Sequence, residues 1–195
     1  MIGNLPQNND NTGNLIGVFG VITAVKALAF TLPAGNNYSL DNAILRLKDY
    51  ETGDNPLVQI RNDVGGNNPG STVLATFTNP APQGLGAFSY TFTPTGPLTF
   101  TAGTKYWLYV TSTSGEFSWT ASNTNQTPTG IATLSGNQFS FNGGSSFSDS
   151  SILNSFQINT ADIPPSVATP EPGAIAALSL FGLGLLGVKG RRNEG

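Results

Sequence analysis

The sequence predicts an all-β protein, an antiparallel β-sandwich of jelly-roll type, followed by a single C-terminal hydrophobic helix. Three observations support this fold class. Apolar and polar residues alternate with a period of two in roughly ten short segments, as expected of strands with one buried face. Clusters of Gly, Pro, Asn and Asp separate these segments at intervals of about 8 to 15 residues. No amphipathic helix of useful length lies between them, which disfavours parallel βαβ layering.

The first half of the chain contains the longer expected strands. Residues 26–32 alternate between small and large apolar side chains, and a turn rich in Gly and Asn follows. Residues 38–50 form the longest expected strand, in which Leu45 and Leu47 lie on the face opposite to charged residues. This pattern predicts a sheet with one buried face and one solvent-exposed face. Further strands are expected at residues 57–61, 71–78 and 86–93.

The second half continues the alternation in shorter pieces. Strands are expected at residues 98–100, 105–111, 116–121, 131–134, 138–141 and 153–158. Residues 161–169 contain a Pro-Pro pair, which favours an extended linker. The predicted organisation is therefore a β-sandwich domain at 1–160, a linker at 161–169 and a tail at 170–195.

The tail has three parts in a fixed order. They are the motif Pro170, Glu171 and Pro172, the apolar run 173–188, and the basic residues Lys189, Arg191 and Arg192. The proline rings remove N–H donors and restrain the preceding residues, so they bar a helix before this point. We expect a helix to begin after them.

The apolar run 173–188 is interpreted as a transmembrane helix. At about 1.5 Å per residue it reaches about 24 Å, slightly less than a hydrocarbon core of about 30 Å. It is apolar on every face, and the cations after it would hold that end in the cytoplasm as a stop-transfer signal. A buried core helix and a disordered tail are the alternatives.

This three-part arrangement resembles the PEP-CTERM sorting signal of Gram-negative bacteria, which exosortases recognise. The resemblance rests on the Pro-Glu-Pro motif, the glycine-punctuated apolar segment and the terminal Arg pair. It implies a precursor held in the inner membrane, single-pass with its C-terminus in the cytoplasm, until a membrane protease cuts near the motif. The mature protein would then reach the cell surface or the extracellular matrix.

The body resembles the choice-of-anchor domains, and among them the R type, over residues 3–160. The resemblance rests on the segments NLPQNNDNTGN, YSLDNAILRLKD and LTFTAGTKYWLYV, and on the Pro-Gly pair before Val73 and Leu74. It implies an extracellular module that occurs with interchangeable C-terminal anchors. The family has no established catalytic residues to carry over.

Composition excludes several classes of function. The 195 residues include no Cys and no His, which removes Ser-His-Asp and Cys-His catalysis, zinc sites and haem ligation. Only 10% of residues are charged, well below the usual quarter or so, and the net charge is −3. Without a basic patch in the body, nucleic acid is not an expected partner.

The N-terminus has neither the charged region nor the apolar region of a signal peptide, although the tail predicts an exported precursor. We expect either that a signal peptide was lost through a wrongly assigned start codon or that the sequence begins at a mature-like N-terminus. The first explanation is favoured, because the sorting tail would otherwise have no use.

Aromatic residues in the second half are candidate glycan contacts, namely Trp107, Tyr109 and Trp119. An exposed ring can stack on a sugar, whereas the plainer interpretation is core packing. The densest acidic region comprises Asp41, Asp49, Glu51, Asp54 and Asp63. A structural Ca²⁺ there is a minor alternative, because the spacing of a calcium loop is missing. No metal site and no cofactor is expected.

The predicted function is that of a non-enzymatic structural or adhesive protein, sorted by an exosortase to the cell surface or to the exopolysaccharide of a biofilm matrix. One alternative is a carbohydrate-binding module that uses exposed aromatic side chains. A weaker alternative is a polysaccharide hydrolase that depends on a pair of carboxylates.

Overall fold

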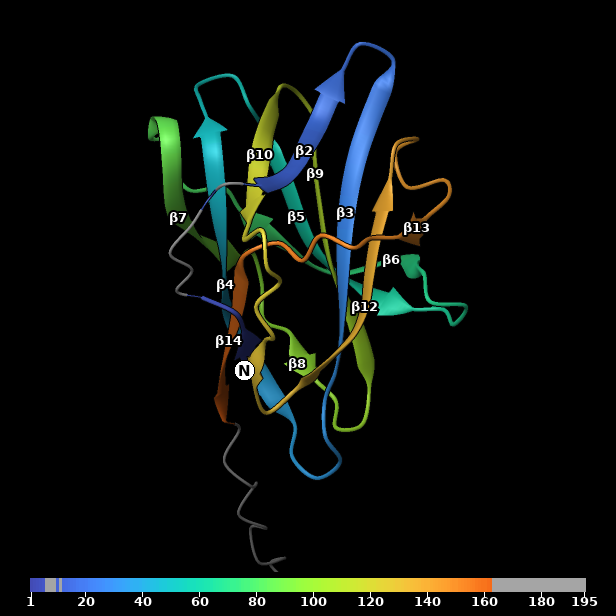
Figure 1. Cartoon of the computed structure of the whole chain (residues 1–195). Coiled ribbons are helices and arrows are strands. Elements are labelled where there is room, and N and C mark those ends of the chain that lie inside the picture. The colour runs from blue at the N-terminus through green and yellow to red at the C-terminus, as the bar shows by residue number, and fades with distance from the viewer. Residues whose placement is uncertain (6–9, 11, 163–195) are drawn as a thin grey trace, which may run out of the picture. The chain divides into compact units, whose positions relative to one another are not determined.

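The computed structural model describes residues 1–5, 10 and 12–162 (Figure 1). In this part of the chain every regular element is a strand, so the all-β prediction is confirmed. The strands are β1 (Ile2–Gly3), β2 (Thr12–Phe19), β3 (Ile22–Thr31), β4 (Tyr38–Tyr50), β5 (Pro56–Asp63), β6 (Pro69–Thr78), β7 (Gly84–Pro94), β8 (Thr99–Phe100), β9 (Lys105–Ser112), β10 (Glu116–Ala121), β11 (Thr129–Gly130), β12 (Thr133–Ser140), β13 (Ser148–Asp149) and β14 (Phe156–Asp162).

Eight strands form a closed antiparallel sheet. In the order β10, β2, β3, β9, β5, β6, β7 and β4, each strand pairs with the next, and β4 pairs with β10 to close the circuit. The other strands extend this sheet (Figure 1): β12 and β13 continue outward from β3, whereas β14, β1 and β11 continue from β4. The short strand β8 also pairs with β4.

This closed sheet corrects the prediction of a jelly-roll-like sandwich of two separate sheets. The connections that close it are very short, because β6 meets β7 only through Phe77 with Pro94 and Thr78 with Thr93. Likewise, β4 meets β10 through only two residue pairs. Period-two patterning shows which strand faces are buried, but it carries no information about such brief edge-to-edge pairings.

The predicted C-terminal helix at 173–188 lies outside the described residues. Across the described ranges, none of the elements is a helix with the length and hydrophobicity required to cross a membrane. The predicted linker also lies outside them, except for Ala161 and Asp162. These two residues are the last of β14 rather than the first of a linker.

Most expected strands are present, with shifted ends. The expected strand 38–50 coincides with β4. Residues 131–134 and 138–141 were expected as two strands, whereas one strand, β12, includes the last two residues of the first range and the first three of the second, and its register shifts between Leu134 and Gly136. The two-residue strands β1, β11 and β13 are too short to show any alternation.

The main apolar core lies inside the closed sheet. Alternate residues of neighbouring strands point inward, among them Leu45 and Leu47 of β4 and Leu108 and Val110 of β9, and all four are fully buried. At about 1.5–3 kcal/mol for each fully buried side chain of this size, such residues supply most of the drive to fold. The opposite face of β9 is then free to carry other side chains.

Candidate functional site

The outer face of β3 and β9 carries a second apolar cluster, which we call the aromatic strip. It consists of Val25, Ala27, Ala29, Trp107 and Tyr109. Small side chains on β3 leave room for two large rings on β9, since Ala27 pairs with Tyr109 and Ala29 with Trp107. Although the strip lies on an outer face, the exposed fraction is 0% for Trp107 and 3% for Tyr109. Other parts of the chain must therefore cover these rings.

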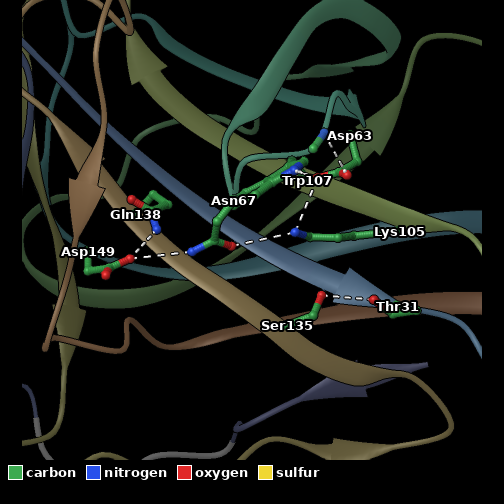
Figure 2. Close-up of polar contacts among 9 residues, drawn as sticks. Thr31, Asp63, Asn67, Lys105, Trp107, Ser135, Gln138 and Asp149 are labelled. Carbon is green, nitrogen blue, oxygen red and sulfur yellow. Dashed lines mark hydrogen bonds and ion pairs between the residues drawn. The ribbon is translucent and has the colours of Figure 1, made fainter.

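A charged pair borders Trp107 (Figure 2). The indole Nε1 of Trp107 donates a hydrogen bond to Asp63 Oδ1 at 2.7 Å. Lys105 Nζ lies 3.2 Å from the same carboxylate oxygen and 4.8 Å from the centroid of the Trp107 ring. The ammonium group thus faces both a carboxylate and an aromatic ring, an arrangement that is electrostatically favourable for each contact.

Asp63 stays ionised in this environment. Partial burial acts to raise its pKa, but hydrogen bonds from Trp107, from the backbone of Gly65 and from Lys105 outweigh burial. The pKa of Asp63 consequently lies below its ordinary value. Asp63 is thereby kept as an acceptor for the indole N–H group at neutral pH.

A chain of polar contacts continues across the strip (Figure 2). Lys105 Nζ donates to Asn67 Oδ1 at 3.5 Å, and Asn67 Nδ2 donates to Asp149 Oδ1 at 3.4 Å. Gln138 Nε2 donates to the same oxygen of Asp149. These contacts connect the loop between β5 and β6 with β9, β12 and β13, four parts of the chain that are distant in sequence.

The loop between β5 and β6 lies against Trp107. A Cβ atom on Gly136 of β12 would come within 2.7 Å of Asn67 Oδ1 and 2.9 Å of Trp107 Cη2. The absence of a side chain at Gly136 therefore allows the indole and Asn67 to meet over β12. Lys105 lies over the Trp107 ring, and Gly136 and Asn67 lie near its Cη2 edge, so strand β12 and the loop both contribute to its burial.

Tyr109 is covered in a different way. The guanidinium carbon of Arg61 lies 3.4 Å from the centroid of the Tyr109 ring, and Arg61 also donates two hydrogen bonds to Gln59 Oε1. The Tyr109 hydroxyl donates to the carbonyl oxygen of Gly143 at 3.4 Å. Burial raises the pKa of Tyr109 above its ordinary value, although Arg61 acts in the opposite direction.

The three candidate glycan contacts are buried, in agreement with the plainer interpretation of core packing, and their role as glycan contacts stays a prediction. Trp107 and Tyr109 are covered as described, and Trp119 lies in the main core with an exposed fraction of 0%. Trp119 Nε1 donates to the carbonyl oxygen of Ser155 at 2.8 Å. None of the three rings is open to a sugar in this conformation. Trp107 and Tyr109 lie on an outer face of the sheet, where the alternation of residues predicts exposure to solvent, but other side chains cover them.

The acidic residues singled out in the sequence do not gather. Within residues 1–5, 10 and 12–162, no three acidic side chains come together as a metal ion would require. Asp54 instead accepts hydrogen bonds from the backbone N–H groups of Glu51 and Glu116, at 2.8 and 3.1 Å. Asp49 accepts one from the backbone N–H of Gly86, whereas Asp41 is exposed. Asp49 and Asp54 thus stabilise turns and strand ends through hydrogen bonds from backbone N–H groups.

Sequence reasoning missed a buried lysine. Lys26 of β3 is 0% exposed, and its Nζ donates to the carbonyl oxygen of Ile152 at 2.8 Å. Burial lowers the pKa of Lys26 to about 7. A signal was present in the alternation, because Lys26 has the same parity as Leu28 and Phe30, which both point into the core.

The predicted sorting residues lie outside the described residues, so no geometry accompanies them. Residues 168–193 match the PEP-CTERM protein-sorting motif, which confirms that prediction. This motif marks an exported protein that exosortase, a membrane protein, processes. The separate roles assigned to Glu171, Arg191 and their neighbours stay predictions, as does the resemblance of the body to choice-of-anchor R domains. No curated protein and no solved structure matches this chain.

Proposed function

We propose that the chain is a non-catalytic structural or adhesive protein of the cell surface or exopolysaccharide matrix. The observation that carries this proposal is the sorting motif at 168–193. In the proposed order of events, the apolar run 173–188 holds the precursor in the inner membrane with the basic cluster in the cytoplasm. Exosortase then cuts near Pro170–Pro172 and releases the β-sheet body.

Two properties of the body support a role outside the cell. Only 10% of the residues of the whole chain are charged, so the surface of the body relies on Asn, Ser and Thr for hydrogen bonding. The free ends of the sheet are also the two-residue strands β11 and β13. At these two ends of the sheet, strands this short offer little template for pairing with other chains, which suits a protein exposed to a crowded matrix.

A polysaccharide hydrolase is a weaker proposal. Such an enzyme needs two carboxyl groups about 5 to 10 Å apart on either side of a sugar bond. Asp54 and Asp63 are instead occupied by hydrogen bonds that hold the fold together. We therefore propose that the body has no catalytic role.

Carbohydrate recognition is the second candidate function, and the aromatic strip favours it. Sugar sites combine an aromatic ring with polar groups that hydrogen-bond hydroxyls. Trp107 has Asp63, Lys105 and Asn67 beside it, with Gln138 and Asp149 one contact farther along the chain of polar contacts (Figure 2). The ring is covered, so recognition would require a rearrangement.

The leading proposal is tested by following the size and location of the full chain in two hosts, one with exosortase and one without. We expect a shortened form outside the inner membrane only in the first host. The double substitution Pro170→Ala and Pro172→Ala should block shortening, whereas Pro164→Ala and Pro165→Ala, which lie before the motif, should not. A chain of equal size and location in both hosts would contradict the proposal.

A further inference from the structure

We propose that residues 64–68 form a lid over a saccharide-binding site centred on Trp107, and that this site takes a neutral pyranose chain. The inference rests on the second candidate function, carbohydrate recognition. It goes beyond that candidate by naming the element that closes the site and the class of sugar that opens it.

The lid is weakly held. Residues 64–68 are all exposed, and Val64, the only large apolar side chain among them, is 64% exposed. Gly65, Gly66 and Asn67 have φ angles of 79°, 63° and 57°, three successive residues in the left-handed region. An asparagine tolerates that region better than most residues but is less stable there than glycine. A segment with so few buried contacts opens at low free-energy cost.

The backbone N–H of Gly65 donates to Asp63 Oδ2 at 3.0 Å at the base of the lid, and Asn67 is the residue that fastens its far end. Its side chain accepts from Lys105 at 3.5 Å and donates to Asp149 at 3.4 Å, and both bonds are long and exposed. Hydrogen bonds of that length between exposed groups contribute little net stability. Asn68, the next residue, contributes a backbone bond to Gly65 within the loop itself.

Opening the loop would uncover one face of the Trp107 ring. Asp63 and Lys105 lie at one end of that face, and Gln138 and Asp149 lie beyond Asn67 (Figure 2). The C–H face of a pyranose ring can stack on the indole while the carboxylates and the amide hydrogen-bond its hydroxyls.

The charges around the strip indicate a neutral sugar. Two carboxylates, Asp63 and Asp149, and two cations, Lys105 and Arg61, lie around the strip, so their formal charges sum to zero. Lys105 pairs with Asp63, and Arg61 lies over the neighbouring ring of Tyr109. A uronic acid would meet the two carboxylates, and an amino sugar would meet the two cations. Only the open form binds the sugar. The apparent affinity of the protein is therefore the affinity of the open form multiplied by the fraction of molecules that are open.

The test uses the full chain and two substitutions. Asn67→Ala removes both side-chain bonds and is less favourable than asparagine at a φ angle of 57°, so both effects favour the open loop. Asn68→Ala makes the same chemical change at the neighbouring exposed residue. Acrylamide quenching of tryptophan fluorescence reports the exposure of Trp107, because Trp119, the other tryptophan, is buried in the main core. Cellohexaose and maltohexaose are the neutral probes, and hexagalacturonate is the charged one.

We expect Asn67→Ala, but not Asn68→Ala, to increase quenching and to bind one of the neutral hexasaccharides about threefold tighter or more than the parent chain. In the Asn67→Ala background, Trp107→Phe should weaken that binding, and Asp149→Ala replaces it as the test if circular dichroism shows that Trp107→Phe does not fold. Equal quenching in the two alanine variants, or no binding of either neutral probe, would overturn the inference. Either result leaves the export proposal standing, because shortening by exosortase is measured independently.

Discussion

Trp107 and Asp63 lie 44 positions apart in the chain and are joined by a hydrogen bond of 2.7 Å from the indole N–H to the carboxylate. This bond connects β9 to the last residue of β5, at the point where the 64–68 loop departs. It satisfies the one polar group of a fully buried ring. The same carboxylate binds Lys105 and accepts a hydrogen bond from the backbone N–H of Gly65, so one side chain serves three partners.

Removing this carboxylate should weaken the outer face. We expect Asp63→Ala to lower the free energy of unfolding by about 1–3 kcal/mol, because a buried N–H group loses its acceptor and Lys105 loses its ion pair. Urea denaturation followed by circular dichroism measures the change. Glu116→Ala, which removes an exposed carboxylate, is the control, and an equal effect of the two substitutions would contradict the assigned role.

Gly136 should not tolerate a side chain. A Cβ there would lie 2.7 Å from Asn67 Oδ1, 2.9 Å from Trp107 Cη2 and 3.0 Å from Ala29 Cβ. We expect Gly136→Ala to cost about 1–3 kcal/mol of stability, because the packed ring and backbone must shift. Gly96→Ala is the matched control, since a Cβ at Gly96 meets no atom within 4 Å. Thermal melts of both variants measure the difference in stability.

Lys26→Met should stabilise the protein near neutral pH. The pKa of Lys26 is about 7 in the folded state because of burial, against 10.5 for an ordinary lysine. Below about pH 7 the buried amine is charged, and we expect the methionine variant to be more stable by roughly 2–4 kcal/mol at pH 6.

The advantage should shrink as pH rises. Between about pH 7 and 10 the unfolded chain binds a proton at Lys26 that the folded chain does not, so the parent gains stability while the variant does not. Melting temperatures of both proteins across this range give the comparison. Lys48→Met removes an exposed charge and should show no such trend. A constant difference at all pH values would contradict burial as the cause.

Asp10→Asn should remove the ion pair between Asp10 and Arg46 of β4. Arg46 donates two hydrogen bonds to Asp10, at 2.5 and 2.6 Å, and these bonds hold the pKa of Asp10 below its ordinary value. Because the pair is partly exposed, we expect a loss of only about 0.5–1.5 kcal/mol at pH 7.

This contribution has the pH dependence of a carboxylate with a lowered pKa. It is fully present above about pH 5 and is lost as pH falls through the folded-state pKa of Asp10, which lies below 3.8, so parent and variant should converge in acid. A series of urea titrations from pH 7 downward measures the convergence. Asp41→Asn, at an exposed position of β4, should show a smaller difference at pH 7.

Sequence patterns predicted the strands better than their arrangement. The alternation over residues 38–50 predicted β4 in full, because Leu45 and Leu47 must face the core whatever they pack against. The same patterns could not predict that β6 and β7 meet through two residue pairs, or that β4 meets β10. Such pairings depend on where strands end and how the sheet curves.

The aromatic strip shows the same limit at the level of side chains. Period two correctly placed Trp107 and Tyr109 on the face of β9 opposite to Leu108. Whether that face is exposed to solvent depends on side chains such as Asn67 and Arg61, which belong to other parts of the chain. Burial by a distant loop leaves no mark on local periodicity.

The sequence by itself determined that the chain is all-β and that it carries a PEP-CTERM sorting motif at 168–193. Both are local properties, because strand alternation and a linear motif are written in neighbouring residues. Only the tertiary structure decided that eight strands close into one sheet, that Lys26 is buried, and that Trp107 is fully buried on the outer face of the sheet. Those features arise from contacts between distant segments, whose free energies depend on positions that only folding brings together.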